Sequence, residues 1–377
     1  MFSDTDTRMM ARALQQARKG RYWASPNPHV GCVLARNDTV IAEGFTQPAG
    51  GNHAEVQALE ALKSASAKGA TAYVTLEPCS HRGKTGPCAI ALVEAGVSRV
   101  VVALEDPNPE VCGKGIQVLR SAGVAVEVGL LESEAAAIIP GFLKRMRKGR
   151  PYVRVKQAMS LDGRTAMASG ESQWITGSAA RQDVQRLRAG SCAVLTGIGT
   201  VLADNCSLTV RSEELGLTGQ EAARAKVRAP LRVVLDSKGQ TPVGANVLNA
   251  AAPTLLCIGK DADGSGLVGG NVEVHSLPAA VASDPDAGGL SLLAVMELLA
   301  QRQCNEILVE SGARLTGALL NAGLVDELVV YMAPTLMGNL ARPLAQLPLN
   351  AMAEKVDLAI TDVRKVGQDW RFTATPS

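Results

Sequence analysis

The sequence predicts an α/β protein of two domains, in which helices cover mostly parallel sheets. The chain has 377 residues, and at roughly one domain per 150 residues this length predicts two domains. Short β-branched runs alternate with segments of helical periodicity, which is the rhythm of βαβ units. The alternation restarts after residues 144–151, KRMRKGRP, where a basic helix end meets a glycine and a proline. We therefore predict domains at residues 1–149 and 150–377.

Composition and charge argue against several classes of function. The formal net charge is only +2, from 38 basic and 36 acidic residues, so nucleic-acid binding is not expected. The basic residues at 144–150 could form a phosphate or RNA patch, but cations are also favourable at a helix C-terminus. No apolar run reaches the roughly 20 residues that span a membrane, and the first residues, MFSDTDTRMMARAL, lack the pattern of a signal peptide. We expect a cytoplasmic protein without a membrane partner.

Eight cysteines are present, but most are scattered singly along the chain. In a reducing compartment such cysteines are expected to be free thiols and not a disulfide framework. The six scattered residues are Cys32, Cys112, Cys192, Cys206, Cys257 and Cys304. Aromatic residues make up only 3% of the chain, so the cores are expected to consist of Ala, Val, Leu and Ile.

In the first domain, apolar spacing predicts a helix over residues 4–19, with Asp4 or Asp6 as its N-cap and Gly20 at its end. Two short strands joined at residues 37–38, Asn-Asp, predict a hairpin. A further helix begins near His53. The elements expected after it are a strand at 72–76, a helix at 88–96, a strand at 99–104, and then helix, strand and helix up to the basic stretch.

The second domain restarts with a predicted strand. Its elements are expected to be a strand at 152–160, a helix at 178–188, strands at 192–205, 231–235 and 254–258, and then helix, strand, turn, helix and strand over 291–334. Residues 211–229 are polar and Ala-rich, which predicts a loop or short helix. Residues 259–289 are rich in Gly, Asp and Ala, so only 272–274 is expected to be a strand there.

A group of candidate metal ligands lies in the first domain, in HAE at 53–55 and EPC at 77–79. His53, Cys79 and Cys88 offer one imidazole and two thiolates, which are ligands that zinc prefers. Three protein ligands leave one coordination position for water, as a catalytic zinc site requires. Glu55, two residues after His53, can act beside the metal as a proton shuttle. The order His-x-Glu and then Pro-Cys is typical of zinc deaminases.

Other interpretations of these residues remain open. Deaminases usually place their two cysteines three apart, whereas eight residues, SHRGKTGP, separate Cys79 from Cys88 here. We expect this longer loop to carry substrate contacts. A structural zinc site would need His81 as a fourth ligand, and buried cysteines without a metal are a further alternative. Asn27, between two prolines before a strand, is expected either to form a turn or to contact a substrate.

A second candidate site is indicated where strands of the second domain give way to helices. Small residues lie at these transitions, and the clearest is residues 311–314, Ser-Gly-Ala-Arg, before a helix. Backbone N–H groups at a helix N-terminus bind phosphate well, although ordinary turns would also explain the glycines. Neither a Rossmann nor a P-loop motif is present. The polar residues expected to form a pocket at these strand ends are Arg188, Asp204, Arg211 and Glu310.

Together, these motifs resemble those of the bifunctional deaminase-reductase family of riboflavin biosynthesis. In the first domain the resemblance rests on HAE at 53–55, TLEPCSHRGKT at 75–85 and PC at 87–88. In the second it rests on SLDGRTAMASGESQWITG from Ser160, VLADN at 201–205 and VESG at 309–312. It covers nearly the whole chain. The resemblance implies a cytidine-deaminase-like domain followed by a dihydrofolate-reductase-like domain.

The resemblance also implies an activity, its cofactors and its contact residues. The expected substrate is a diaminopyrimidinone that carries a ribosylamino 5′-phosphate. The first domain, with one zinc per chain, would replace its ring 2-amino group by oxygen, and the second would use NADPH to reduce the opened ribose to ribityl. Deaminase substrate contacts would be Asn27, His81 and Lys84. Reductase substrate contacts would be Lys156, Ser172, Arg188, Asp204, Leu208, Arg211 and Glu310. NADPH contacts would be Ala158, Trp174, Thr200, Asp204, Gly312, Ala313, Arg314, Leu315, Thr316, Gly317 and Ala318.

Three alternative functions remain at this stage: a deaminase beside a non-catalytic second domain, a nucleic-acid-editing deaminase, and a zinc module without activity. The near-neutral charge and the few aromatics oppose the editing enzyme. Family resemblance further implies a homo-oligomer.

Overall fold

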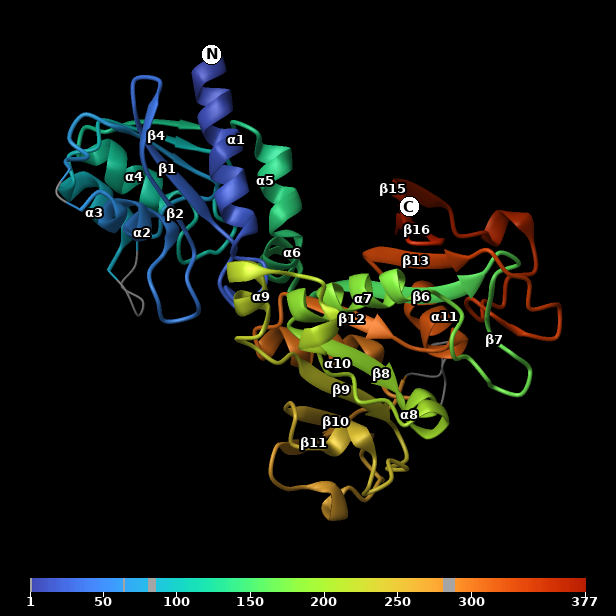
Figure 1. Cartoon of the computed structure of the whole chain (residues 1–377). Coiled ribbons are helices and arrows are strands. Elements are labelled where there is room, and N and C mark those ends of the chain that lie inside the picture. Colours follow the sequence, from blue (N-terminus) through green and yellow to red (C-terminus); the bar gives the residue numbers. More distant parts are fainter. Residues whose placement is uncertain (1, 64, 81–85, 281–288) are drawn as a thin grey trace. The chain divides into compact units, whose positions relative to one another are not determined.

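The computed structural model describes residues 2–63, 65–80, 86–280 and 289–377. The chain divides into two compact units, Met1–Gly149 and Arg150–Ser377. Each unit is an α/β fold with its own sheet (Figure 1). Their cores consist mainly of Ala, Val, Leu and Ile, as the composition predicts.

The first unit is built on a five-stranded sheet of order β2-β1-β3-β4-β5. Helices α1 and α5 lie on one side of the sheet, and α2, α3 and α4 lie on the other (Figure 1). The strands are β1 (Gly31–Arg36), β2 (Thr39–Phe45), β3 (Thr71–Val74), β4 (Arg99–Val102) and β5 (Ala125–Val128). The helices are α1 (Asp4–Arg18), α2 (Ala54–Ala61), α3 (Cys88–Glu94), α4 (Lys114–Ser121), α5 (Glu132–Ile138) and α6 (Pro140–Lys148).

The predicted hairpin is confirmed, and two other details of the first unit differ from expectation. Strands β1 and β2 pair antiparallel around a two-residue turn in which Asn37 has a φ of 53°. The sheet is mixed, because β2, β1 and β3 pair antiparallel and only β3, β4 and β5 are parallel. The N-cap of α1 is Ser3 and not Asp4 or Asp6. Asp6 instead closes a capping box from the third helical position.

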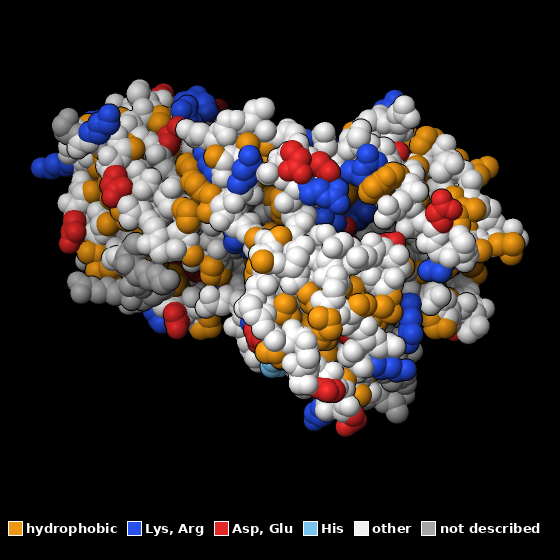
Figure 2. All heavy atoms as spheres, turned by 60° about the horizontal axis from the view of Figure 1, so that its bottom comes forward, with side chains coloured by type: hydrophobic (Ala, Val, Ile, Leu, Met, Phe, Trp, Pro, Cys, Tyr) orange, Lys and Arg blue, Asp and Glu red, His pale blue; other side chains and the backbone are white. Residues whose placement is uncertain are grey.

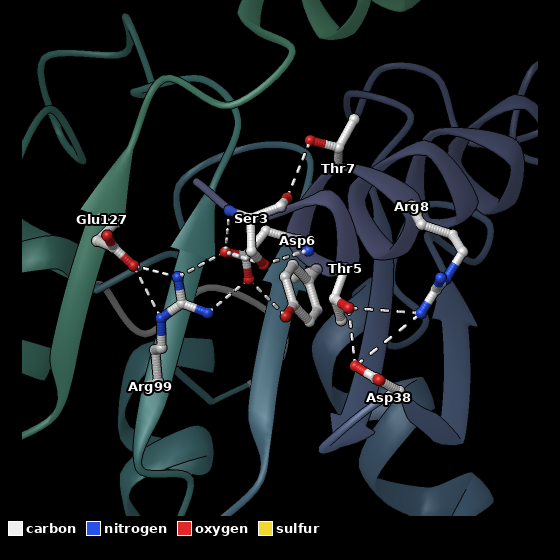
Figure 3. Close-up of polar contacts among 9 residues, drawn as sticks. Ser3, Thr5, Asp6, Thr7, Arg8, Asp38, Arg99 and Glu127 are labelled. Atoms are coloured by element: carbon white, nitrogen blue, oxygen red, sulfur yellow. Dashed lines mark hydrogen bonds and ion pairs between the residues drawn. The ribbon is translucent and has the colours of Figure 1, made fainter. Parts of the chain in front are cut away.

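The buried carboxylate of Asp6 also joins α1 to the sheet (Figure 3). It accepts hydrogen bonds from Tyr73 on β3 and from the guanidinium of Arg99 on β4. Arg99 reaches on to Glu127 of β5, so one arginine joins two carboxylates from different elements (Figure 3). The bond from Arg99 holds the pKa of Asp6 well below its usual range, although burial alone would raise it.

Substituting Asp6→Asn is expected to destabilise the first unit by about 2 kcal/mol, because a charge-assisted hydrogen bond to Arg99 is lost. The folded-state pKa of Asp6 is depressed, so its contribution is present above the unfolded pKa of about 3.9 and is lost as the pH falls through the folded value. The free energies of unfolding of wild type and Asp6→Asn, measured with denaturant at pH 7 and in acid, test this prediction. Equal stability of the two proteins at pH 7 would contradict the prediction.

The second unit is built on a nine-stranded sheet of order β11-β10-β9-β8-β12-β6-β13-β16-β15. The seven strands from β11 to β13 pair in parallel, and β16 and β15 continue the sheet antiparallel. These strands are β6 (Tyr152–Ser160), β8 (Ala193–Gly197), β9 (Leu231–Asp236), β10 (Thr254–Gly259), β11 (Val272–Leu277), β12 (Glu306–Glu310), β13 (Glu327–Ala333), β15 (Leu358–Val366) and β16 (Asp369–Pro376). A separate pair consists of β7 (Arg164–Ala166) and β14 (Arg342–Pro343).

The helices of the second unit follow the predicted alternation, with one correction. They are α7 (Ser178–Gly190), α8 (Ile198–Asp204), α9 (Gly219–Ala225), α10 (Leu292–Gln301) and α11 (Ala313–Asn321), with short 3-10 turns at Ser212–Glu214, Asn246–Leu248, Ser265–Leu267 and Met352–Glu354. The single strand predicted over 192–205 is wrong beyond Gly197, because α8 begins at the next residue. Among the described residues, no helix is both long and apolar enough to span a membrane.

Candidate active sites

Three elements of the first unit bring the candidate metal ligands together. His53 is the N-cap of α2, Cys79 lies in the segment after β3, and Cys88 is the first residue of α3. Helix α2 packs directly on β2 at Gly44, where an added Cβ would lie 2.2 Å from the Ala54 carbonyl oxygen. Only a glycine allows this close approach of helix and strand.

The three candidate ligands converge in one place. One donor atom each from His53, Cys79 and Cys88 lies within 4.8 Å of the others. The His53 Nδ1 atom is 3.5 Å from the Cys79 Sγ and 3.4 Å from the Cys88 Sγ. One imidazole nitrogen and two sulfurs at this spacing fit a single zinc ion, with one coordination position left for water.

Glu55, on the first turn of α2, is buried beside these ligands, with 3% of its surface exposed. Burial, together with the charge of the Cys79 thiolate, raises the pKa of Glu55 to about 7. A carboxyl with a pKa near the working pH suits general acid and base catalysis. Hydrogen bonds from Cys88 and His53 lower the pKa of Cys79 to about 4, which gives the site a thiolate.

Of the three substrate residues predicted in the first unit, the structure describes only Asn27. Asn27 is half-buried in the loop between α1 and β1, and its backbone N–H donates to the Ala24 carbonyl oxygen. His81 and Lys84 lie outside the described residues. The part of the chain that the structure describes contributes no fourth His, Cys, Asp or Glu to the cluster of three ligands.

The second unit contains a cavity of about 1230 Å³ at the carboxyl ends of its parallel strands. Most of the residues predicted for substrate and cofactor line it. They are Lys156, Ala158, Ser172, Trp174, Arg188, Thr200, Asp204, Leu208, Arg211, Glu310, Gly312, Ala313, Arg314 and Leu315. The predicted residues Thr316, Gly317 and Ala318 are buried within α11 and do not line the cavity. A cavity of this size is large enough for two small molecules.

An ion pair forms part of the cavity wall. The Arg188 guanidinium on α7 donates to both oxygens of Glu310 at 2.5 and 2.9 Å, and a third bond of 2.8 Å reaches the Thr209 carbonyl oxygen. Lys156, on the neighbouring strand β6, lies opposite Glu310. Burial lowers the pKa of Lys156. Burial alone would raise the pKa of Glu310, but the charges of Arg188 and Lys156 hold it below its ordinary value.

The N-terminus of α11 forms another part of the wall. Gln157 on β6 donates to the Ser311 carbonyl oxygen at 2.9 Å and also to the Thr316 hydroxyl. These bonds fix the turn before α11, whose first N–H groups are suited to phosphate. The Ser172 hydroxyl, also in the wall, lies 3.5 Å from the carboxylate of Asp204 at the end of α8.

Several residues of the wall were not predicted from the sequence. Arg181 lies over the Trp174 ring, at 4.6 Å from the ring centroid, while Lys238 and Arg342 add further positive charge to the cavity. Lys238 could have been suspected because it follows a strand end, where α/β ligand sites lie. Arg342 comes from β14, and no signal in the sequence connects it to the cavity.

Comparison with known proteins decides the family. Residues 3–104 match the family described as the cytidine and deoxycytidylate deaminase zinc-binding region. Residues 151–372 match the RibD C-terminal domain. The chain belongs to the RibD family of riboflavin biosynthesis proteins.

Relatives of the RibD family align with the chain almost from end to end. The riboflavin biosynthesis protein RibD of Escherichia coli is 48% identical over 97% of this chain and 97% of its own. The RibD protein of Haemophilus influenzae is 46% identical over 100% of this chain and 98% of its own. The solved structure of Acinetobacter baumannii RibD is 45% identical over 99% of both chains, with a TM-score of 0.88. A deaminase/reductase structure from Thermotoga maritima, 31% identical over 99% of both chains, has a TM-score of 0.84.

Membership of the RibD family settles several predictions. The chain is an enzyme of riboflavin biosynthesis with a zinc-binding deaminase domain and a reductase domain of the NADPH-dependent type. The alternative of a deaminase beside a non-catalytic domain is not favoured, because the second unit matches a reductase family over most of its length.

Proposed function

We propose that this chain deaminates a diaminopyrimidinone carrying a ribosylamino 5′-phosphate in its first unit and reduces the ribose of the product in its second. The observation that carries the proposal is the convergence of His53, Cys79 and Cys88 on one point, with Glu55 buried beside them. The cavity of the second unit, with the predicted substrate and cofactor residues in its wall, supports the reduction step.

In the deamination step, His53, Cys79 and Cys88 would hold zinc, which supplies Lewis acidity to activate water near neutral pH. Glu55 accepts a proton from the attacking water and returns it to the nitrogen that leaves as ammonia. Its raised pKa allows both transfers near neutral pH. We assign Asn27, His81 and Lys84 to the binding of the pyrimidine phosphate.

In the reduction step, NADPH supplies the hydride, and the protein supplies binding and orientation. The N–H groups of Gly312, Ala313 and Arg314 at the start of α11 suit the cofactor pyrophosphate. Ala158, Trp174, Thr200 and Leu315 would complete the cofactor site. Thr316, Gly317 and Ala318 would support this turn from within the helix.

We assign the substrate side of the cavity to the residues around the ion pair. Arg188 and Arg211 provide guanidinium groups that suit the substrate phosphate. Lys156, Glu310 and Ser172 add a charged and polar wall next to them, and Leu208 adds an apolar one. Asp204, within reach of Ser172, would be shared between substrate and cofactor.

The substrate is a small molecule and not a nucleic acid, and two features agree with this. The formal net charge is +2. On the face that Figure 2 shows, Lys and Arg side chains lie among Asp and Glu side chains and not in one broad basic patch. We also propose that the enzyme works in the cytoplasm, because none of the eight cysteines is joined in a disulfide, as expected in a reducing compartment.

We further propose that two copies associate through β15, the edge strand of the nine-stranded sheet. One edge of this strand has no partner strand among the described residues. The apolar side chains of Leu358, Ile360 and Val363 are 45%, 61% and 46% exposed. A long apolar edge strand is a ready template for pairing with a second chain.

Substituting Ile360→Asp is therefore expected to convert the oligomer to a smaller species, since a charge would be buried without a partner in the interface. Light scattering after size exclusion measures the mass. Val243→Asp is the control, because Val243 is 76% exposed but lies in a loop away from β15. If wild type is a monomer, or if both variants keep the wild-type mass, association through β15 is excluded.

The proposed function is tested by giving one purified, zinc-loaded chain the freshly prepared pyrimidine phosphate together with NADPH. The expected result is one ammonia released and one NADPH oxidised for each substrate consumed. Intact protein that neither releases ammonia nor oxidises NADPH would overturn the proposal.

A further inference from the structure

Glu77 lies two residues before the candidate ligand Cys79, and its side chain is buried, with 4% of the residue exposed. Its carboxylate accepts hydrogen bonds from four backbone N–H groups of one later segment. The donors are Asp106, Gly113, Gly115 and Ile116, at 3.2, 3.0, 2.9 and 3.2 Å. Glu77 is in none of the ion pairs between described residues. Backbone N–H groups therefore solvate its charge.

Through these bonds, the Glu77 side chain provides the acceptor that an N-cap side chain would normally provide for α4. The N-cap of this helix is Gly113, which has a φ of 77° and no side chain to accept from the first helical N–H groups. Such groups need an acceptor from elsewhere when they are buried. The carboxylate of Glu77 takes that place from a distant part of the sequence, and its negative charge is favourable at the positive end of the helix dipole.

Helix α4 also packs closely on the chain between Glu77 and Cys79. A Cβ added at Gly115 would lie 1.9 Å from the Pro78 carbonyl oxygen, so the contact is possible only because residue 115 is a glycine. Pro78 itself has a fixed φ. The path from the Glu77 carboxylate to the Cys79 backbone is therefore short and stiff.

Cys79 is fixed from its other side by α3. Its carbonyl oxygen accepts from the Ala89 N–H at 3.1 Å, and its Sγ accepts from the Cys88 N–H at 3.4 Å. On the near side, the Glu77 N–H donates to the Leu104 carbonyl oxygen at 2.9 Å. The position of the Cys79 sulfur thus depends on α3 and on the Glu77 segment.

We propose that Glu77 is a positioning residue of the zinc site, which holds Cys79 in place by fixing the preceding peptide against α4. This inference rests on the proposed metal site. Partners that orient a metal ligand typically change metal affinity by about 10- to 100-fold when they are removed. Substituting Glu77→Gln keeps the size of the side chain but turns an NH2 group toward N–H donors, so at least two of the four bonds are lost.

The test loads the full chain with zinc and follows its transfer to an excess of a pyridylazoresorcinol dye. Zinc is expected to leave Glu77→Gln about 10- to 100-fold faster than wild type. The cobalt-loaded variant is expected to show a shifted visible spectrum, because the sulfur ligand has moved. Asp6→Asn is the matched control, since Asp6 is an equally buried carboxylate of the same unit that closes the capping box of α1 and is bonded to Ser3, Tyr73 and Arg99. Its zinc release and cobalt spectrum are expected to match wild type.

The outcomes separate this inference from the proposed metal site. Wild type that binds no zinc would remove the metal site and the inference together. Wild type that binds zinc, with equal release rates for Glu77→Gln and Asp6→Asn, would overturn the inference alone. If Glu77→Gln does not fold, the same zinc-release measurement is made on Gly115→Ala, which forces α4 away from Pro78. This variant is expected to release zinc faster than Asp6→Asn, and an equal release rate would overturn the inference.

Discussion

Substituting Glu55→Gln is expected to lower the rate of ammonia release by about 10²- to 10⁴-fold, which is the usual contribution of a general acid and base. Glu55 is buried beside the three candidate metal ligands but is not one of them. Glutamine has the same size but cannot accept a proton. The loss is therefore expected in the rate constant, with zinc content unchanged.

The measurement is ammonia release from the pyrimidine phosphate, together with the metal content of each protein. Glu60→Gln serves as the control, because Glu60 lies on the same helix but is exposed to solvent. It is expected to keep wild-type activity. A Glu55→Gln protein that retains zinc and deaminates at the wild-type rate would show that another group moves the proton.

Substituting Glu310→Gln is expected to lower the rate of NADPH oxidation by about 100-fold, because the groups that orient the substrate are displaced. The change leaves Arg188 and Lys156 without their carboxylate in the cavity wall. Breaking a buried pair of this kind typically costs about 3–5 kcal/mol of stability. The variant is therefore expected to unfold in its second unit at a lower denaturant concentration than wild type.

The stability difference between wild type and Glu310→Gln should depend on pH. The folded-state pKa of Glu310 is held below its ordinary value, so the contribution is present above the unfolded pKa of about 4.3 and is lost as the pH falls through the folded value. The control is Glu306→Gln on the same strand, whose carboxylate pairs with Arg154 at 3.1 Å and does not line the cavity. Equal loss of reduction in both variants would indicate that instability, and not the site, is responsible.

The sequence predicts the ligands of the first site because they lie in short, distinctive motifs at the ends of regular elements. HAE opens α2 and EPC follows β3, so strand and helix order places both at one edge of the sheet. The role that we infer for Glu77 could not be predicted in this way. Its partners lie 29 to 39 residues later in the chain and are backbone groups, which have no residue signature.

The errors in the fold have similar physical causes. The sequence GIGTV combines glycines with β-branched residues and favours a strand, but the chain turns into α8 directly after Gly197. The strand β15 was not predicted, because eight of its nine residues are exposed and it has no buried face to produce an alternating pattern. Arg342 could not be connected to the cavity either, because its strand β14 has only two residues and pairs with β7, more than 170 residues earlier in the chain.

The presence of two independent active sites in one chain can be tested by giving each of two variants both substrates. Glu55→Gln is predicted to fail on the diaminopyrimidinone but to oxidise NADPH at the wild-type rate with the deaminated intermediate. Glu310→Gln is predicted to release ammonia at the wild-type rate but to fail with that intermediate. If either substitution removes both activities from a folded, zinc-loaded protein, the assignment of one reaction to each unit is contradicted.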